Sequence, residues 1–106
     1  MDGRYNNLTM GIDIPGDKIK DFCRRNHIRR MALFGSVLRD DFTPQSDIDI
    51  LVEFEEGKTP GFAFFGMEIE LGEMLGRKVD LNTPGSFSGV LKERVLKSSE
   101  VIFDAA

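Results

Sequence analysis

The sequence predicts an α/β (α+β) fold, in which a small mixed β-sheet carries helices packed on it. Two observations lead to this class. Apolar residues recur at helical spacing in two stretches, residues 14–26 and 62–75. Short apolar runs typical of strands lie between and after them, at residues 30–34, 47–54 and 78–81.

The chain order of the elements follows from these patterns and from the residues that interrupt them. We expect a helix at 14–26, a strand at 30–34, a helical turn at 37–40, a loop at 42–45, a central strand at 47–54, a loop or hairpin at 55–61, a helix at 62–75, a strand at 78–81, a helix at 90–97 and an edge strand at 101–103. Pro15 favours the first helix start, and Gly76 suits a left-handed cap after the second long helix.

Each helix is expected to turn an apolar face inward. The inward side chains are Ile19, Phe22 and Cys23 in the first helix, Phe64, Met67, Leu71, Met74 and Leu75 in the second, and Val90, Leu91 and Val95, with Leu96 as a further candidate, in the third.

The bulk properties fit one small domain. With 106 residues, we expect a single domain over residues 12–106 and a mobile leader over residues 1–11. One cysteine excludes an internal disulfide and fits a cytoplasmic location. No apolar run is long enough to span a membrane, and a net charge of −4 argues against direct nucleic-acid binding.

Two single residues are of types that often take part in chemistry, but their positions in the sequence favour a structural role. Cys23 lies on the apolar helix stripe, so we expect a buried filler rather than a reactive thiol. His27 is the only histidine and follows a helix, which favours a helix-end or surface position over acid–base chemistry. Because no second histidine or neighbouring cysteine accompanies it, a zinc site has no support.

Two clusters leave alternatives open. The cationic cluster is Arg24, Arg25, Arg29 and Arg30. It could attract a triphosphate or RNA, but a solvated helix end matched to the helix dipole is favoured. The aromatic cluster is Phe62, Phe64 and Phe65. Its helical spacing favours core or interface packing over a platform for stacking bases.

The most informative stretch is the acidic start of the central strand. Side chains alternate along a strand, so Asp47 and Asp49 face one way and Ile48 and Ile50 the other. The two carboxylate positions are roughly 6–7 Å apart, where like charges repel by about 2–3 kcal/mol at an effective dielectric of about 20. Such a pair suggests a hard divalent cation held by oxygen ligands.

A Gly-Ser turn precedes this acidic strand by ten residues and makes the pattern specific. Phe34-Gly35-Ser36-Val37-Leu38-Arg39 is followed by Ser46-Asp47-Ile48-Asp49. Together these motifs resemble the minimal nucleotidyltransferases of the polymerase-β-like superfamily, the MNT proteins found beside HEPN-domain proteins. The resemblance covers about residues 14–103 and implies the nucleotidyltransferase fold.

The resemblance also implies a site. Asp47 and Asp49 correspond to the paired metal ligands of the family, and Asp80, in Leu75-Gly76-Arg77-Lys78-Val79-Asp80, to its third acid, a ligand or base. Two Mg²⁺ ions, with Mn²⁺ as the alternative, would serve in-line nucleotidyl transfer. Gly35 and Ser36 would accept the phosphates of the nucleotide. Arg39 would reach the triphosphate or pair with Asp40 or Asp41.

The function implied is transfer of AMP from ATP to a hydroxyl of a partner protein, as an antitoxin that silences a HEPN-family toxin. The rival hypotheses are an antitoxin that acts by contact alone and a nucleotide-binding module without transfer activity. Two departures from the family pattern bear on activity: Leu38 and Asp40 flank the arginine where many members have Ala and Gly. No second domain is recognisable to hold an acceptor, so we expect a partner or an oligomer to supply it.

Overall fold

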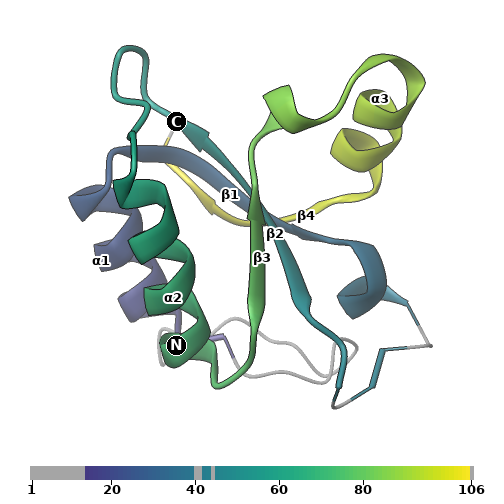
Figure 1. Cartoon of the computed structure of the whole chain (residues 1–106), viewed down its shortest axis with the longest axis horizontal. Helices are drawn as coiled ribbons and strands as arrows, with labels where there is room; N and C mark the ends of the chain where they lie inside the picture. Colours follow the sequence, from purple (N-terminus) through teal and green to yellow (C-terminus); the bar gives the residue numbers. More distant parts are fainter. Residues whose placement is uncertain (1–13, 40–41, 44, 106) are drawn as a thin grey trace.

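The computed structural model describes residues 14–39, 42–43 and 45–105. In chain order the elements are α1 (Gly16–Arg25), β1 (Ile28–Phe34), η1 (Gly35–Leu38), β2 (Ile48–Phe54), α2 (Ala63–Leu75), β3 (Val79–Asn82), η2 (Pro84–Ser86), α3 (Gly89–Ser98) and β4 (Glu100–Asp104), where η marks a 3₁₀ turn (Figure 1). The expected leader at residues 1–11 lies outside the described residues. No helix in the described ranges is long and apolar enough to cross a membrane.

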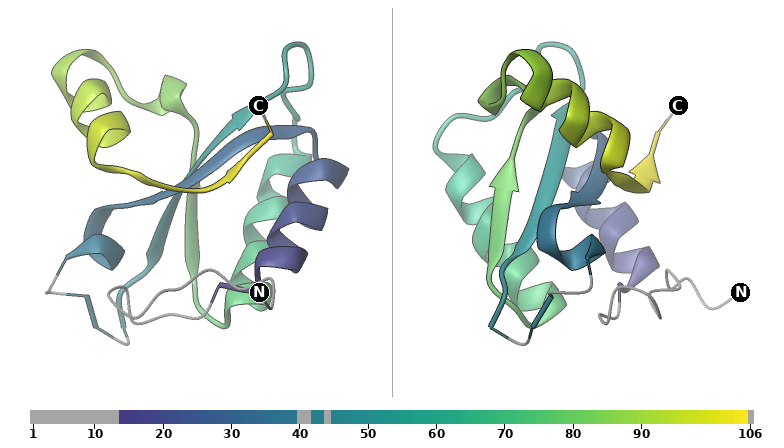
Figure 2. Two further views of the ribbon diagram at one scale, coloured as in Figure 1. Left: turned by 180° about the vertical axis from the view of Figure 1, so that it is seen from behind. Right: turned by 90° about the vertical axis from the view of Figure 1, so that its right-hand side faces the viewer.

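The four strands form one mixed sheet in the order β3-β2-β1-β4 (Figures 1 and 2). β1 pairs antiparallel with both β2 and β4, and β2 pairs parallel with β3. The parallel pair needs a crossover, which α2 provides between β2 and β3. The α/β prediction, the inner position of β2 and the edge position of β4 are confirmed.

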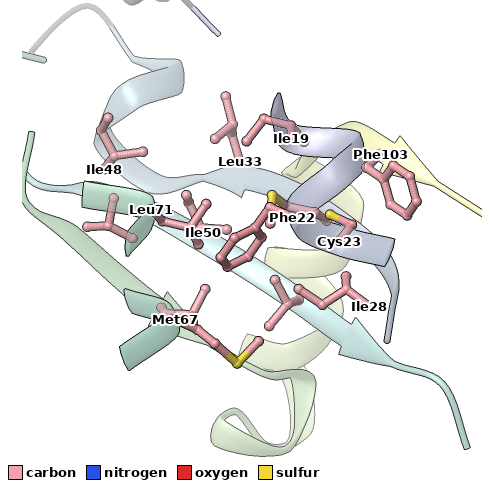
Figure 3. Close-up of a cluster of buried hydrophobic side chains, with 14 of the residues drawn as sticks. Ile19, Phe22, Cys23, Ile28, Leu33, Ile48, Ile50, Met67, Leu71 and Phe103 are labelled. Carbon is pink, nitrogen blue, oxygen red and sulfur yellow. The ribbon is translucent and has the colours of Figure 1, made fainter. Parts of the chain in front are cut away.

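The core lies between one face of the sheet and helices α1 and α2, which cover that face side by side (Figures 1 to 3). Ile48, Ile50 and Val52 of β2 are fully buried there, as the alternation along the strand predicts. Phe22 of α1 and Leu71 of α2 are equally buried against them. The acidic residue between these core positions, Asp49, is therefore directed to the opposite face of the sheet.

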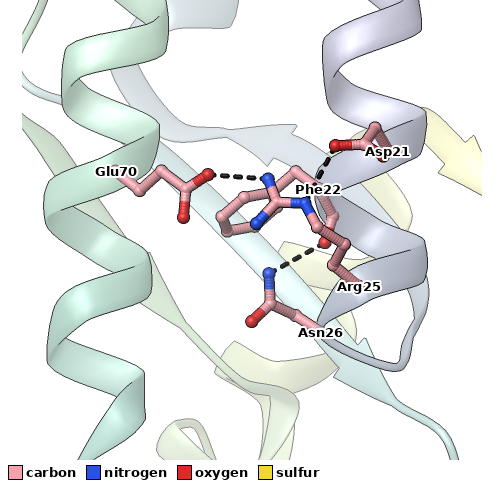
Figure 4. Close-up of polar contacts among 5 residues, drawn as sticks. All are labelled: Asp21, Phe22, Arg25, Asn26 and Glu70. Atoms are coloured by element: carbon pink, nitrogen blue, oxygen red, sulfur yellow. Dashed lines mark hydrogen bonds and ion pairs between the residues drawn. The ribbon is translucent and has the colours of Figure 1, made fainter.

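The end of α1 is fixed by polar contacts that occupy much of the cationic cluster (Figure 4). Arg25 donates to Asp21 Oδ2 at 2.8 Å and to Glu70 Oε2 of α2 at 2.7 Å. Arg29 and Arg30 lie 2.6 and 3.8 Å from the Glu53 carboxylate. Three of the four arginines are therefore engaged within the chain, which favours the structural interpretation of the cluster over a triphosphate site.

The two single residues of interest also have structural roles. His27 follows α1 with a positive φ of 56°, so it occupies the left-handed position at the helix end. Its Nδ1 lies 3.6 Å from Glu55 Oε1. Cys23 is fully buried, and that burial raises its pKa to about 12. Both structural predictions are confirmed, since a thiol this hard to ionise is a poor nucleophile.

Several boundaries differ from expectation. β1 begins at Ile28, earlier than the expected 30, and the helical turn occupies Gly35–Leu38 rather than 37–40. The stretch 55–61 is a loop that connects β2 to α2, which is the loop alternative of the prediction.

The prediction for the last helix was partly wrong. Val95 is 9% exposed and faces inward, but Val90 and Leu91 are 65% and 56% exposed. α3 projects away from the α1–α2 layer on the loop between β3 and β4 (Figures 1 and 2), so its first turn has little sheet surface to cover.

Candidate active site

Asp49 and Asp80 are brought together by the parallel pairing of β2 and β3, in which they are register partners. Register partners on adjacent strands present their side chains on the same face of the sheet. The charge of Asp80 lies close enough to Asp49 to raise the pKa of the Asp49 carboxyl. The two acids, 31 positions apart in the sequence, therefore meet on the face opposite α1 and α2.

Several neighbouring groups act on the pKa of Asp49. Burial of its carboxyl raises its pKa above the ordinary value, and the charges of Asp80 and Asp47 raise it further. A hydrogen bond from the Ser36 backbone N–H acts in the opposite direction. The net effect is a pKa above that of a free aspartate, with burial as the main cause and the neighbouring acids adding to it.

Gly35 is required by this arrangement for two reasons. Its φ is +76°, a conformation that side chains disfavour. A Cβ at this position would overlap Asp49 Oδ2 and lie 3.1 Å from Asp49 Cγ. In this structure the room left by the glycine is therefore filled by the Asp49 carboxylate, and the same turn aims the Ser36 N–H at it.

The turn η1 is too short to provide a useful helix dipole. η1 has four residues, and the Arg39 backbone N–H donates to Ser36 O at 2.9 Å to end it. Arg39 itself is exposed, at the entrance to the loop that contains Asp40 and Asp41. Those two acids lie outside the described residues, so their expected pairing with Arg39 stays a prediction.

Asp47 lies at the start of the same strand but makes a different contact. Its Oδ2 is 3.9 Å from Lys78 Nζ, with the lysine side chain 82% exposed, which is a weak surface ion pair. Arg77, the other cation near β3, donates to Thr43 O at 2.7 Å and lies over the Phe42 ring. The pattern Arg77-Lys78-Val79-Asp80 also allows a structural role for Asp80 as an ion-pair partner of Lys78 or Arg77, but the contacts above join these two cations to other groups.

The carboxylate oxygens at this site suit a hard divalent cation, although they are not arranged as a complete set of metal ligands. Asp49 and Asp80 offer adjacent carboxylate oxygens, which Mg²⁺ and Mn²⁺ prefer. Across the described ranges, no three acidic, histidine or cysteine side chains are gathered closely enough to hold a metal ion. The structure thus brings two of the three expected acids into contact and leaves Asp47 beside Lys78.

Sequence reasoning missed two residues next to this site, Glu68 and Phe87. Glu68 of α2 accepts a hydrogen bond from the Leu81 backbone N–H at 2.8 Å, directly after Asp80. Nothing in the helical pattern marks Glu68, because the contact depends on how α2 packs beside β3. The Phe87 ring packs edge-on against Phe34, with centroids 5.6 Å apart, beside the Gly35 turn.

The aromatic cluster of α2 divides between the core and the surface. Phe64 packs against Phe54, with ring centroids 6.4 Å apart. Phe62 and Phe65 are 91% and 64% exposed, and Ile69 of the same helix is 65% exposed. These three residues form an apolar stripe at helical spacing on the outer surface of α2, which we call the α2 stripe.

Comparisons with known proteins agree with this geometry. Residues 17–102 match the family model described as nucleotidyltransferase domain. A Methanocaldococcus jannaschii protein, provisionally named a protein adenylyltransferase, is 39% identical over 90 residues, covering 85% of this chain and 96% of the relative.

Two solved structures share the fold. A chain in the crystal structure of a toxin–antitoxin with AMP-PNP matches with a TM-score of 0.68 and 28% identity, over 83% of this chain and 72% of that one. A chain in the structure of a tri-AMPylated Shewanella oneidensis HEPN toxin in complex with MNT antitoxin matches with a TM-score of 0.60 and 28% identity, over 83% and 68%.

Proposed function

The chain belongs to the nucleotidyltransferase domain family, and from this membership we propose that it transfers AMP from ATP to a hydroxyl of a HEPN-family toxin and so acts as an antitoxin. The observation that carries the proposal is the contact between Asp49 and Asp80 beside the Gly35 turn. The AMPylated HEPN toxin bound to an MNT antitoxin, a structure that this chain resembles, supports the choice of group and partner.

The three acids Asp47, Asp49 and Asp80 would hold two divalent cations, Mg²⁺ or Mn²⁺. Bound there, these ions would stabilise the charge that develops on the attacking and departing oxygens. Two features support this assignment: the oxygen-only donor set, and the negative charges of Asp80 and Asp47 beside Asp49, which together favour a bound cation. Asp47 would join the others by giving up its 3.9 Å contact with Lys78, which costs little at the surface.

In the transfer itself, the acceptor hydroxyl oxygen attacks the α-phosphorus of ATP and forms a new P–O bond. The bond from that phosphorus to the oxygen bridging to the β-phosphate breaks, and pyrophosphate leaves. The hydroxyl proton passes to water or to Asp80, whose role as ligand or base stays open. Ser36 and Arg39 would orient the triphosphate, since Ser36 lies where the turn starts beside Asp49 and Arg39 directly follows the turn.

The proposal is tested by mixing the purified protein with α-labelled ATP, Mg²⁺ and the HEPN toxin encoded in the same genome. We expect label on the toxin and release of pyrophosphate. Asp47→Asn should abolish labelling, whereas Asp17→Asn, an exposed acid in the first turn of α1, should not. Absence of label with the wild-type protein, or equal label with Asp47→Asn, would overturn the proposal.

A second candidate function, inhibition of the toxin by contact alone, is favoured by the α2 stripe. Phe62, Phe65 and Ile69 expose an apolar surface that a monomer does not need. If contact suffices, Asp47→Asn will still protect cells from the toxin, and Phe62→Ser combined with Phe65→Ser will not. If instead Asp47→Asn fails to protect cells and the double Phe→Ser variant still protects them, AMP transfer is the antitoxin activity.

A further inference from the structure

Among the strands of the described residues, β3 has a neighbour on one side only. It is the outer strand of the sheet, hydrogen-bonded to β2 along one edge (Figure 2). With only four residues, Val79–Asn82, it is also shorter than β1 and β2. A short strand held along one side is the least constrained part of a sheet, yet this strand carries Asp80.

In addition to the backbone pairing of β3 with β2, two side chains hydrogen-bond the peptide group that joins Asp80 to Leu81. Its N–H, on Leu81, donates to Glu68 Oε2 at 2.8 Å. Its carbonyl oxygen, on Asp80, accepts a hydrogen bond from Asn82 Nδ2 at 3.2 Å. The Glu68 contact is partly buried between α2 and β3, and a bond from an amide to a carboxylate is stronger than one between neutral groups.

Glu68 therefore takes the place of a missing neighbouring strand. It comes from α2, whose Met67 and Leu71 are buried in the same core cluster as Val79 and Leu81 of β3. Fixing the plane of the peptide after Asp80 fixes the direction of the Asp80 side chain. That direction matters because Asp80 must stay against Asp49, a like charge that repels it when both are ionised.

We propose that Glu68 is a positioning residue: through the Leu81 N–H it holds β3 in the orientation that keeps Asp80 against Asp49. The inference rests on the proposed function for its effect on catalysis, but the hydrogen bond itself is testable without any activity. Glu68 acts through the backbone, and its own carboxylate does not contact Asp49 or Asp80 in any described interaction.

The test uses the full chain with three substitutions. Glu68→Ala removes the acceptor, and Glu68→Gln keeps an acceptor oxygen without the charge. Glu73→Ala removes an exposed glutamate from the same helix, on the same groove beside Val79. For each, amide hydrogen exchange of Leu81 is measured by NMR on the metal-free protein, and kcat and KM for ATP are measured with the HEPN toxin as acceptor.

We expect Glu68→Ala to speed exchange at Leu81 about tenfold or more and to lower kcat about 10- to 100-fold, as loss of a supporting hydrogen bond does at metal sites. KM for ATP should change less than about twofold, because the residues that would bind the triphosphate are untouched. Glu68→Gln should restore most of both properties, and Glu73→Ala should match the wild type.

Unchanged exchange at Leu81 in Glu68→Ala would overturn the proposal, as would fast exchange with wild-type kcat. Loss of activity in Glu68→Gln with Leu81 still protected would also overturn it, because the charge rather than the hydrogen bond would then matter. If Glu68→Ala does not fold, Glu68→Leu replaces it, keeping the volume without the acceptor. A wild-type protein without transfer activity would refute the proposed function alone, and exchange would still decide whether Glu68 holds β3.

Discussion

Asp49 and Asp80 are register partners across the parallel strands β2 and β3, and the charge of Asp80 raises the pKa of the Asp49 carboxyl. Two acids in contact can share a proton or a cation, but they cannot both be ionised there without a cost. The predictions below follow from this pair and from the groups packed around it.

The first prediction concerns pH and stability. Burial, followed by the charges of Asp80 and Asp47, raises the folded-state pKa of Asp49 above its unfolded value. The folded state therefore binds more protons, and Asp49 lowers stability as pH rises through the interval between the two pKa values. Asp49→Asn should raise the free energy of unfolding of the metal-free protein at pH 7 by about 0.5–2 kcal/mol.

Urea denaturation in EDTA measures this effect. At a pH below the ordinary Asp value, Asp49 is protonated in both states, so the advantage of Asp49→Asn should shrink towards zero. Asp17→Asn is the control, since Asp17 is an exposed acid far from the pair. An equal gain at both pH values would contradict the electrostatic origin.

The second prediction concerns Gly35. Gly35→Ala places a Cβ at a positive φ and against the Asp49 carboxylate. The backbone conformation alone should cost about 1–2 kcal/mol, and displacement of Asp49 should abolish AMP transfer. Thermal unfolding and the labelling assay measure the two effects.

Gly66→Ala is the matched control for the glycine. Gly66 lies inside α2, and a Cβ there meets nothing within 4 Å. Because alanine is the better helix former, this change should raise stability by about 0.5–1 kcal/mol and leave transfer intact. Wild-type stability and activity in Gly35→Ala would refute the role given to Gly35.

The third prediction concerns metal binding. A divalent cation that binds the folded protein stabilises it by mass action, by about 2.7 kcal/mol at a concentration 100 times its dissociation constant. Mg²⁺ or Mn²⁺ should therefore raise the melting temperature of the wild-type protein. Asp49→Asn and Asp80→Asn should each remove most of that increase, and EDTA should reverse it. An increase that survives both substitutions would place the cation elsewhere.

The fourth prediction concerns Cys23. Its thiol is fully buried and has a pKa of about 12, so the folded protein should resist a thiol-specific reagent at pH 8. In denaturant, one thiol per chain should react at once. Rapid reaction of the folded protein would show that α1 opens readily from the sheet, which its buried face argues against.

Most of the fold could be predicted from the sequence because local residue patterns determine the strands and helices. Alternation along residues 47–54 assigned Ile48 and Ile50 to the core, and helical spacing did the same for Met67 and Leu71. The wrong predictions concern residues whose burial depends on how the elements pack against one another. Val90 and Leu91 have the composition of an inward face, but α3 has little surface to cover at its first turn.

For the candidate site, the sequence by itself determined the chemistry: a Gly-Ser turn, two acids on one strand face, and a third acid that family resemblance pointed out. Only the tertiary structure decided which of them meet. The parallel register sets Asp80 against Asp49, Asp47 lies 3.9 Å from the exposed Lys78, and Glu68 reaches the edge of β3 from another element. Such contacts join residues distant in the chain, so no local pattern can encode them.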